Sequence, residues 1–162
     1  METKPNQDPI CCPEFHPEPW DDNISEWQLK RFLKDRVCTV MHMPLNFGAV
    51  MRRMNEKVEA AGAAMPDYLC LSDHTSGWNM DIYLAVDREI PGGQMVALGG
   101  SYYSKVYEGP FKDTGKWIKN FRDTVKEKGL TMKKMYVWYT TCPKCAKKYG
   151  KNYVVLFAET GT

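Results

Sequence analysis

The apolar residues of segments 46–62 and 113–129 recur every three or four positions, with polar residues between them. This spacing gives each segment one buried stripe and predicts two amphipathic helices. Each segment begins with a residue that favours a helix N-cap, Asn46 or Asp113, and each ends at a glycine suited to the C′ position. The segments align without a gap at an offset of 67 residues (113 − 46), so they are two copies of one unit.

Segments rich in β-branched and aromatic residues flank both predicted helices, which predicts strands. In each copy one strand precedes the helix and two follow it. The expected strands cover residues 36–43, 67–72 and 79–87 in the first copy, and 101–109, 134–141 and 152–160 in the second. Two such strand–helix–strand–strand (SHS2-like) units, related by a pseudo-twofold axis, predict an α+β fold with a curved antiparallel sheet of about six strands. Both helices would cover one face, and the other face would form a ligand cleft.

The alternation of side chains along the last two strands suggests what lines this cleft. Tyr136 and Trp138 share one face of their strand, while the intervening residues suit contact with the helices. In the final strand, Phe157 and Glu159 alternate with aliphatic residues, so we expect them to face the cleft. Large aromatic side chains on an open face are typical of a binding site.

Two further aromatic residues belong to the expected ligand site. Tyr103 lies in the strand over 101–109, where either alternating set would offer tyrosines to the cleft. Trp78 lies just before a strand and would cap an edge of the sheet.

The expected carboxylate among rings has two chemical uses. Glu159 could hold a cationic or planar ligand, or act as a general acid or base. Tyr136 could donate a hydrogen bond to a developing oxyanion. A solvated acid at a strand end and a packing tyrosine are the alternative interpretations.

Composition restricts the class of protein further. The 162 residues are enough for one domain with a substantial core. A net charge of +2 is too small to predict nucleic-acid binding by electrostatics alone, so we expect no nucleic-acid partner. No apolar run approaches the ~20 residues of a membrane span, and the N-terminus lacks the apolar core of a signal peptide. We therefore expect a cytoplasmic protein with no membrane partner.

Four cysteines in loops form the candidate metal site. Cys142 and Cys145 have the spacing of one zinc knuckle, and Cys11 and Cys12 are candidates for the remaining ligands. Adjacent cysteines are a poor second pair for a tetrahedral ion. The alternatives are a structural zinc, a redox-labile thiol cluster and free thiols, and we favour free thiols. We expect catalysis to need no cofactor.

Residues 1–30 differ from the rest of the chain and contain five prolines. We interpret them as a partly disordered N-terminal arm that packs on a domain formed by residues 31–162 and rims its cleft. Ser25 is a plausible N-cap, and Trp27 and Phe32 belong to a short apolar stripe that predicts a helix near the end of the arm.

The doubled unit, with "YEGPF" at residues 107–111 leading into the second helix, resembles the GyrI-like small-molecule-binding domain. This effector-binding module also occurs in AraC- and MerR-type regulators. The resemblance covers roughly residues 31–160. No helix-turn-helix precedes it, so the chain looks like a stand-alone member.

Three further motifs, "CCPEFHPEPWDD", "MPLNFG" and "TTCPKCAKKYGKNYVVLFAE", resemble one bacterial branch of that family. Similar members hydrolyse cyclopropane-bearing, DNA-alkylating natural products as self-protection. In that chemistry water opens a strained ring held between aromatic walls, assisted by a tyrosine and a glutamate. The resemblance implies catalytic roles for Tyr136 and Glu159, with Tyr139 as the competing tyrosine.

The resemblance therefore implies a hydrolase that acts on hydrophobic aromatic small molecules. The alternatives are a non-catalytic binder or sensor of planar or cationic small molecules, and a protein-interaction role such as gyrase inhibition. Detection of a ring-opened product separates the enzyme from the binder.

Overall fold

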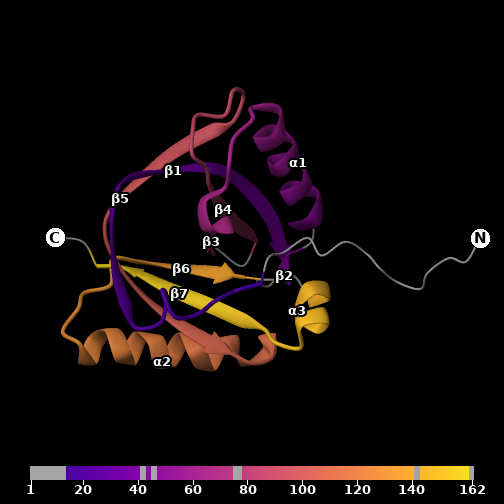
Figure 1. Ribbon diagram of the computed structural model, residues 1–162. Coiled ribbons are helices and arrows are strands. Elements are labelled where there is room, and N and C mark those ends of the chain that lie inside the picture. Colours follow the sequence, from indigo (N-terminus) through magenta and orange to yellow (C-terminus); the bar gives the residue numbers. More distant parts are fainter. Residues whose placement is uncertain (1–13, 41–42, 45–46, 75–77, 141–142, 161–162) are drawn as a thin grey trace, which may run out of the picture.

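A computed structural model describes residues 14–40, 43–44, 47–74, 78–140 and 143–160 of the chain. Two α-helices of equal length form within the segments that carry the apolar stripes: α1 spans Phe47–Ala60 and α2 spans Thr114–Glu127. Their starts are 67 residues apart (114 − 47), which is the offset of the sequence repeat. α1 and α2 lie on different parts of the sheet, α2 along the lower side of the molecule in Figure 1.

The described residues form seven strands in one antiparallel sheet, with order β2-β1-β4-β3-β6-β7-β5. The strands are β1 (Asn23–Val40), β2 (Met43–Pro44), β3 (Cys70–Asp73), β4 (Asn79–Ala85), β5 (Gln94–Glu108), β6 (Lys134–Tyr139) and β7 (Tyr153–Glu159). Short 3-10 turns, η1 (Pro66–Tyr68) and η2 (Phe111–Asp113), and a helix, α3 (Pro143–Tyr149), complete the described elements. The expected α+β class with an antiparallel sheet is confirmed.

The two long strands close the sheet on itself. β1 pairs with β4, where Phe32 lies opposite Ala85, and it also pairs with β5, where Asn23 lies opposite Ser104. Because β5 continues the sheet through β7, one face of the sheet is turned inward (Figure 1). The face expected to form an open cleft is therefore largely enclosed, since the sequence pattern does not reveal the pairing of β1 with β5.

Each large helix buries its apolar stripe against its own patch of the outer face. Val50, Met54 and Val58 of α1 pack on the β1–β4 side. Phe121 and Val125 of α2 pack against residues of β5, β6 and β7. Each such buried side chain stabilises the fold by about 1.5–3 kcal/mol. A third cluster fills the inward side of the sheet.

The glycine of the "EGPF" motif permits the close approach of α2. Gly109 has φ 148°, which glycine adopts readily and L-residues avoid. A Cβ atom at this position would lie 3.1 Å from Cζ2 of Trp117, on the first turns of α2. The glycine therefore brings the chain from β5 into α2 while Trp117 packs directly over the turn.

The expected helix near Trp27 is wrong, because residues 23–40 form one strand. Two residues of β1 between Trp27 and Lys30 match one of β5 between Gly100 and Leu98, which is a β-bulge. The extra residue brings Trp27 and Phe32, five positions apart, onto the same inward face. The spacing of Trp27 and Phe32 therefore resembles a helical stripe, although it results from one extra residue in a strand.

This bulge lies inside the segment expected to be an arm. β1 runs through the expected boundary between residues 30 and 31, so residues 23–30 are part of the sheet. Leu29 at the bulge has φ 51° and is exposed.

The connection between β6 and β7, which carries the CPKC motif, contains α3. β7 begins 74 residues after β4 (153 − 79), seven more than the helix offset of 67 (114 − 47), and α3 has seven residues. The segment with the CPKC motif is thus partly helical. None of the described helices is both long enough and apolar enough to span a membrane.

Candidate functional site

The inward side of the sheet, which we call the interior face, gathers large aromatic side chains from β1, β4, β5, β6 and β7. Tyr136 and Trp138 of β6 lie beside Phe157 of β7, and Tyr136 and Phe157 are direct cross-strand partners. Tyr102 of β5, Tyr83 of β4 and Phe32 of β1 belong to the same cluster, and Trp27 of β1 packs against it. All of these rings except Trp27 are buried. The alternation of β6 and β7 thus brings together three of the residues expected to bind a ligand.

At one end of the interior face, rings from the N-terminal segment cover these residues. Trp20 contacts Trp138 edge-on with ring centroids 5.2 Å apart, and its centroid lies 5.9 Å from that of Phe157. Phe15 contacts Trp138 in the same way at 5.3 Å and lies 5.4 Å from Tyr153. We call this the aromatic end, defined by Phe15, Trp20, Trp138, Tyr153 and Phe157.

The segment that carries Trp20 is fixed to β5 by hydrogen bonds. The Trp20 carbonyl oxygen accepts a hydrogen bond from Oγ of Ser104 at 2.7 Å. The Asp21 carboxylate accepts one from the Val106 backbone N–H at 3.1 Å, and the Asp22 carboxylate accepts one from the Tyr103 hydroxyl at 2.6 Å. Trp20 is therefore held over Trp138 as part of the folded domain.

A groove of about 280 Å³ opens beside the aromatic end. Its lining combines rings with two carboxylates, Glu14 and Asp67. The lining residues are Glu14, Phe15, His16, Pro19, Trp20, Asp67, Tyr68, Trp138 and Thr140. Rings beside carboxylates attract a flat cation through its charge and its face.

The opposite end of the interior face is charged. The Lys134 ammonium lies 2.8 Å from Oδ2 of Asp73. Asp81 is buried and pairs with Arg36 at 3.1 Å and with Lys34 at 3.7 Å. We call this the charged end, defined by Lys34, Arg36, Asp73, Asp81, Lys134 and Glu159.

Glu159 lies at the end of β7, half-buried, between two neighbouring strands. Its direct partners are Lys134 on β6 and Tyr102 on β5. Directly opposed residues share one face of the sheet with Cβ atoms about 5 Å apart. Glu159 therefore lies beside Lys134 and Tyr102 on the interior face, at the half-buried end of β7.

The environment keeps the nearby phenols protonated. Burial raises the pKa of Tyr136 to about 12; Lys134 opposes this shift, while Tyr83, Glu159 and Asp73 add to it. Burial also raises the pKa of Tyr102, and the charge of Glu159 raises it further. Both side chains are hydrogen-bond donors at neutral pH.

The pKa of Lys134 reflects two opposed effects. Burial lowers it, but the hydrogen bond to Asp73 and the negative charge of that carboxylate, together with electrostatic effects of Tyr136 and Tyr83, outweigh burial and raise it overall. The side chain remains an ammonium at neutral pH.

Three residues expected at the ligand site lie elsewhere. Tyr103 faces α2, where its ring stacks on that of Phe121 at 5.8 Å, so its neighbour Tyr102 supplies the interior face instead. Tyr139 also packs on the α2 side. Trp78 precedes β4 and is 66% exposed.

Tyr139 and His74 form a polar contact apart from the interior face. The Tyr139 hydroxyl lies 3.2 Å from Nε2 of His74, and burial raises the pKa of Tyr139. The competing tyrosine is therefore separated from Glu159 by the thickness of the sheet, since odd and even positions of β6 point to opposite faces.

Sequence reasoning missed Tyr102 and Lys134 as members of the site. Tyr102 belonged to one of two equivalent alternating sets, and only the register that pairs it with Glu159 selects between them. A signal for Lys134 did exist, because it shares the alternation of Tyr136 and Trp138.

Three of the four candidate metal ligands, Cys11, Cys12 and Cys142, lie outside the residues that the structure describes. Cys145 lies on α3 and is buried. In the described part of the chain, no three His, Cys, Asp or Glu side chains are grouped in a way that could hold a metal ion. The zinc hypothesis thus stays a prediction.

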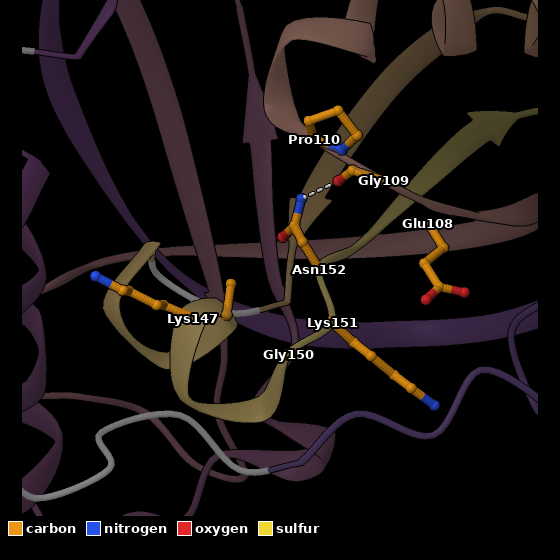
Figure 2. Close-up of a pocket in the computed structure, with 8 residues that line it drawn as sticks. Glu108, Gly109, Pro110, Lys147, Gly150, Lys151 and Asn152 are labelled. Carbon is orange, nitrogen blue, oxygen red and sulfur yellow. Dashed lines mark hydrogen bonds between the residues drawn. The ribbon is translucent and has the colours of Figure 1, made fainter.

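Figure 2 shows a second groove, of about 380 Å³, between the end of β5 and the connection from α3 to β7. Nδ2 of Asn152 donates a hydrogen bond to the Gly109 carbonyl at 2.8 Å. Lys147 extends to one side of the groove, and Glu108 and Lys151 extend to the other (Figure 2). The charged groups around this groove do not point to one place. We therefore place the candidate site on the interior face, although this groove is larger than the one beside the aromatic end.

The closed antiparallel sheet, the helices on its outer side and the aromatic interior define a GyrI-like small-molecule-binding fold. The crystal structure of the EcmrR C-terminal domain has this fold at a TM-score of 0.62 and 8% identity, with 86% of this chain and 96% of that chain covered. A crystal structure of a hydrolase from Listeria innocua matches at a TM-score of 0.57 and 12% identity, with 87% and 93% covered. Among curated proteins, none matches the chain.

The chain belongs to the bacterial hydrolase family, whose sequence model matches residues 2–160. This match covers nearly the whole chain and includes the segment that carries Trp20.

One expectation about partners is corrected by these relatives. The cryo-EM structure of the EcmrR–DNA complex in EcmrR-RPo matches at a TM-score of 0.64 and 10% identity, with 86% of this chain and 57% of that chain covered. The fold thus occurs in a protein bound to DNA. The prediction that the protein has no relation to nucleic acids was wrong, because the near-neutral charge of this domain does not decide what a larger protein with the same fold binds.

Proposed function

We propose that this chain is a hydrolase that opens strained cyclopropane rings of reactive, aromatic, DNA-alkylating small molecules. The observation that carries the proposal is the position of Glu159, which lies opposite Tyr102 and near Tyr136 where an aromatic interior meets solvent. Membership in the bacterial hydrolase family and the hydrolase neighbour from Listeria innocua support hydrolysis as the type of reaction.

Each residue has a chemical role in this proposal. Glu159 accepts a proton from water as the water oxygen bonds to a ring carbon. The strained carbon–carbon bond breaks, and its electron pair moves to an acceptor group conjugated with the ring. The Tyr136 hydroxyl donates a hydrogen bond to that group as it becomes negative. The proton held by Glu159 completes the product, so water is the only co-reactant.

Product analysis tests the proposal. A cyclopropane-containing alkylator is incubated with a limiting amount of protein, and the ring-opened product is measured by mass spectrometry. More than one product molecule per protein is expected for the wild type. Stoichiometric binding without product would contradict the enzyme and favour a binder.

The variant Glu159→Gln tests the assignment of the residue. It keeps the shape of the side chain and removes its capacity as a base, so kcat should fall by a factor of about 10²–10⁴. Glu108→Gln is the matched control, because Glu108 is an exposed acid at the second groove. An unchanged kcat in Glu159→Gln would remove Glu159 from the mechanism.

The groove beside the aromatic end favours a second candidate function, the binding of planar cations without turnover. Glu14 and Asp67 would supply the charge, and Trp20 and Trp138 the rings. Titration of the chain with a planar dye cation, followed by fluorescence, tests this function. Asp67→Asn should weaken binding several-fold, whereas equal affinity of variant and wild type would contradict a role for this groove.

A further inference from the structure

Lys134 is the cation of the charged end that lies over the ring of the phenol assigned to the reaction and stands opposite the assigned carboxylate across the strands. Its Nζ atom lies 5.3 Å from the ring centroid of Tyr136 and 6.0 Å from that of Tyr83. In the register of β6 and β7 it stands directly opposite Glu159. These neighbours of Lys134 come from β4, β6 and β7, the last by strand pairing, so the residue lies where the proposed catalytic strands meet.

Asp73 fixes this ammonium without closing it off. The salt bridge of 2.8 Å uses one of the three N–H donors of Lys134. The side chain of Lys134 is 40% exposed, while that of Asp73 is 13% exposed. At least one donor of Lys134 therefore remains available at the partly exposed charged end of the interior face.

The charges of this end balance before the reaction and become unbalanced during it. Three cations, Lys34, Arg36 and Lys134, pair with Asp73 and Asp81, and a third carboxylate, Glu159, stands opposite Lys134 across the strands. When Glu159 takes a proton from water, the formal sum rises from 0 (3 − 3) to +1 (3 − 2). An excess positive charge then arises at the moment when negative charge develops on the substrate.

We propose that Lys134 is a further catalytic residue, which with the Tyr136 hydroxyl binds the substrate oxygen that becomes negative as the ring opens. The inference rests on the proposed function and narrows its substrate class. Suitable substrates carry a carbonyl conjugated with the strained ring, because the electron pair of the breaking bond must reach an oxygen beside Lys134. Strained rings that lack such a carbonyl should react poorly.

The variant Lys134→Met tests this role, because it keeps the length of the side chain and removes its charge. We expect kcat for ring opening to fall about 100-fold with little change in KM, as for loss of one oxyanion donor. Lys134→Arg, which restores the charge, should recover part of the loss. Lys116→Met is the matched control, since Lys116 lies on α2 and is 86% exposed.

A second variant separates catalysis from a structural ion pair. Asp73→Asn removes the salt bridge but keeps the ammonium, so it should retain more kcat than Lys134→Met. Equal losses in the two variants would overturn the catalytic role. A kcat within about threefold of wild type in Lys134→Met would overturn it too.

A binding measurement keeps the inference testable without turnover. The probe is 4-nitrophenol, whose phenolate absorbs separately from its phenol, titrated with wild type, Lys134→Met and Lys134→Arg. We expect the wild type and the arginine variant to bind the phenolate about tenfold more tightly than the methionine variant. Equal phenolate affinities would overturn the inference. A wild type that binds phenolate through Lys134 but opens no ring would refute the proposed function and leave the anion site supported.

Discussion

The two ends of the interior face are built from different chemistry on the same strands. At the aromatic end, Trp20 and Phe15 pack on Trp138 with ring centroids 5.2 and 5.3 Å apart. Toward the charged end, Tyr136 and Lys134 lie two and four residues before Trp138 on β6, among carboxylates and phenols. One end is closed by rings from another segment, and the other reaches solvent through Lys134 and Glu159.

This difference separates stability from chemistry. Rings removed from water contribute to the free energy of folding roughly in proportion to their buried apolar area. Half-exposed ion pairs contribute little, because solvent screens them and their long side chains lose entropy. We therefore expect changes at the aromatic end to lower stability and changes at the charged end to lower activity.

The largest effect should follow Trp20→Ala at the aromatic end. The variant removes the ring that contacts both Trp138 and Phe157. It should lower the free energy of unfolding by about 3 kcal/mol. This value is at the lower end for truncation of a tryptophan, because Trp20 is half-buried. Urea denaturation followed by fluorescence measures the loss, and Trp20→Phe should recover much of it. Below the unfolding transition, kcat should stay within about threefold of wild type. A large drop in kcat from a folded Trp20→Ala protein would break the division between the two ends.

The next effect concerns the tyrosines around the charged end. Tyr136→Phe removes the proposed donor and should lower kcat about 100-fold, with a small change in stability. Tyr102→Phe should have a smaller effect, because the Tyr102 hydroxyl donates to the Gly99 carbonyl at 3.3 Å. Tyr139→Phe should leave kcat unchanged, because Tyr139 faces α2. Steady-state kinetics on the three variants ranks them, and a dominant effect of Tyr139→Phe would restore the competing assignment.

The smallest effect is a pH-dependent change at the segment that holds Trp20. The hydrogen bond from Tyr103 and the one from Lys128 lower the pKa of Asp22 below its ordinary value of 3.8. A carboxyl whose pKa is lower in the folded state stabilises the protein above its unfolded pKa, and that contribution disappears as pH falls through the folded pKa. Asp22→Asn should therefore be less stable than wild type at neutral pH and nearly equal to it in strong acid. Urea midpoints of both proteins across this pH range measure the difference, and a constant gap would contradict the linkage.

Local periodicity accounts for what the sequence predicted well. The helices fall within the segments with apolar stripes, because the 3.6-residue repeat depends only on neighbours along the chain. The alternation of β6 and β7 likewise placed Tyr136, Trp138 and Phe157 on one face. The helix expected near Trp27 failed because a single inserted residue in a strand imitates helical spacing over a short window.

The sequence by itself determined which residues share a face within each helix and strand, since that follows from backbone geometry. Only the tertiary structure decided which faces meet. The pairing of β1 with β5 encloses the interior face, and it joins residues 60 or more positions apart, as for Phe32 and Val96. The register of β7 places Glu159 between Tyr102 and Lys134, and the hydrogen bonds of residues 20–22 to β5 place Trp20 over Trp138. Such long-range contacts depend on the packing of the whole sheet, and no local pattern in the sequence specifies them.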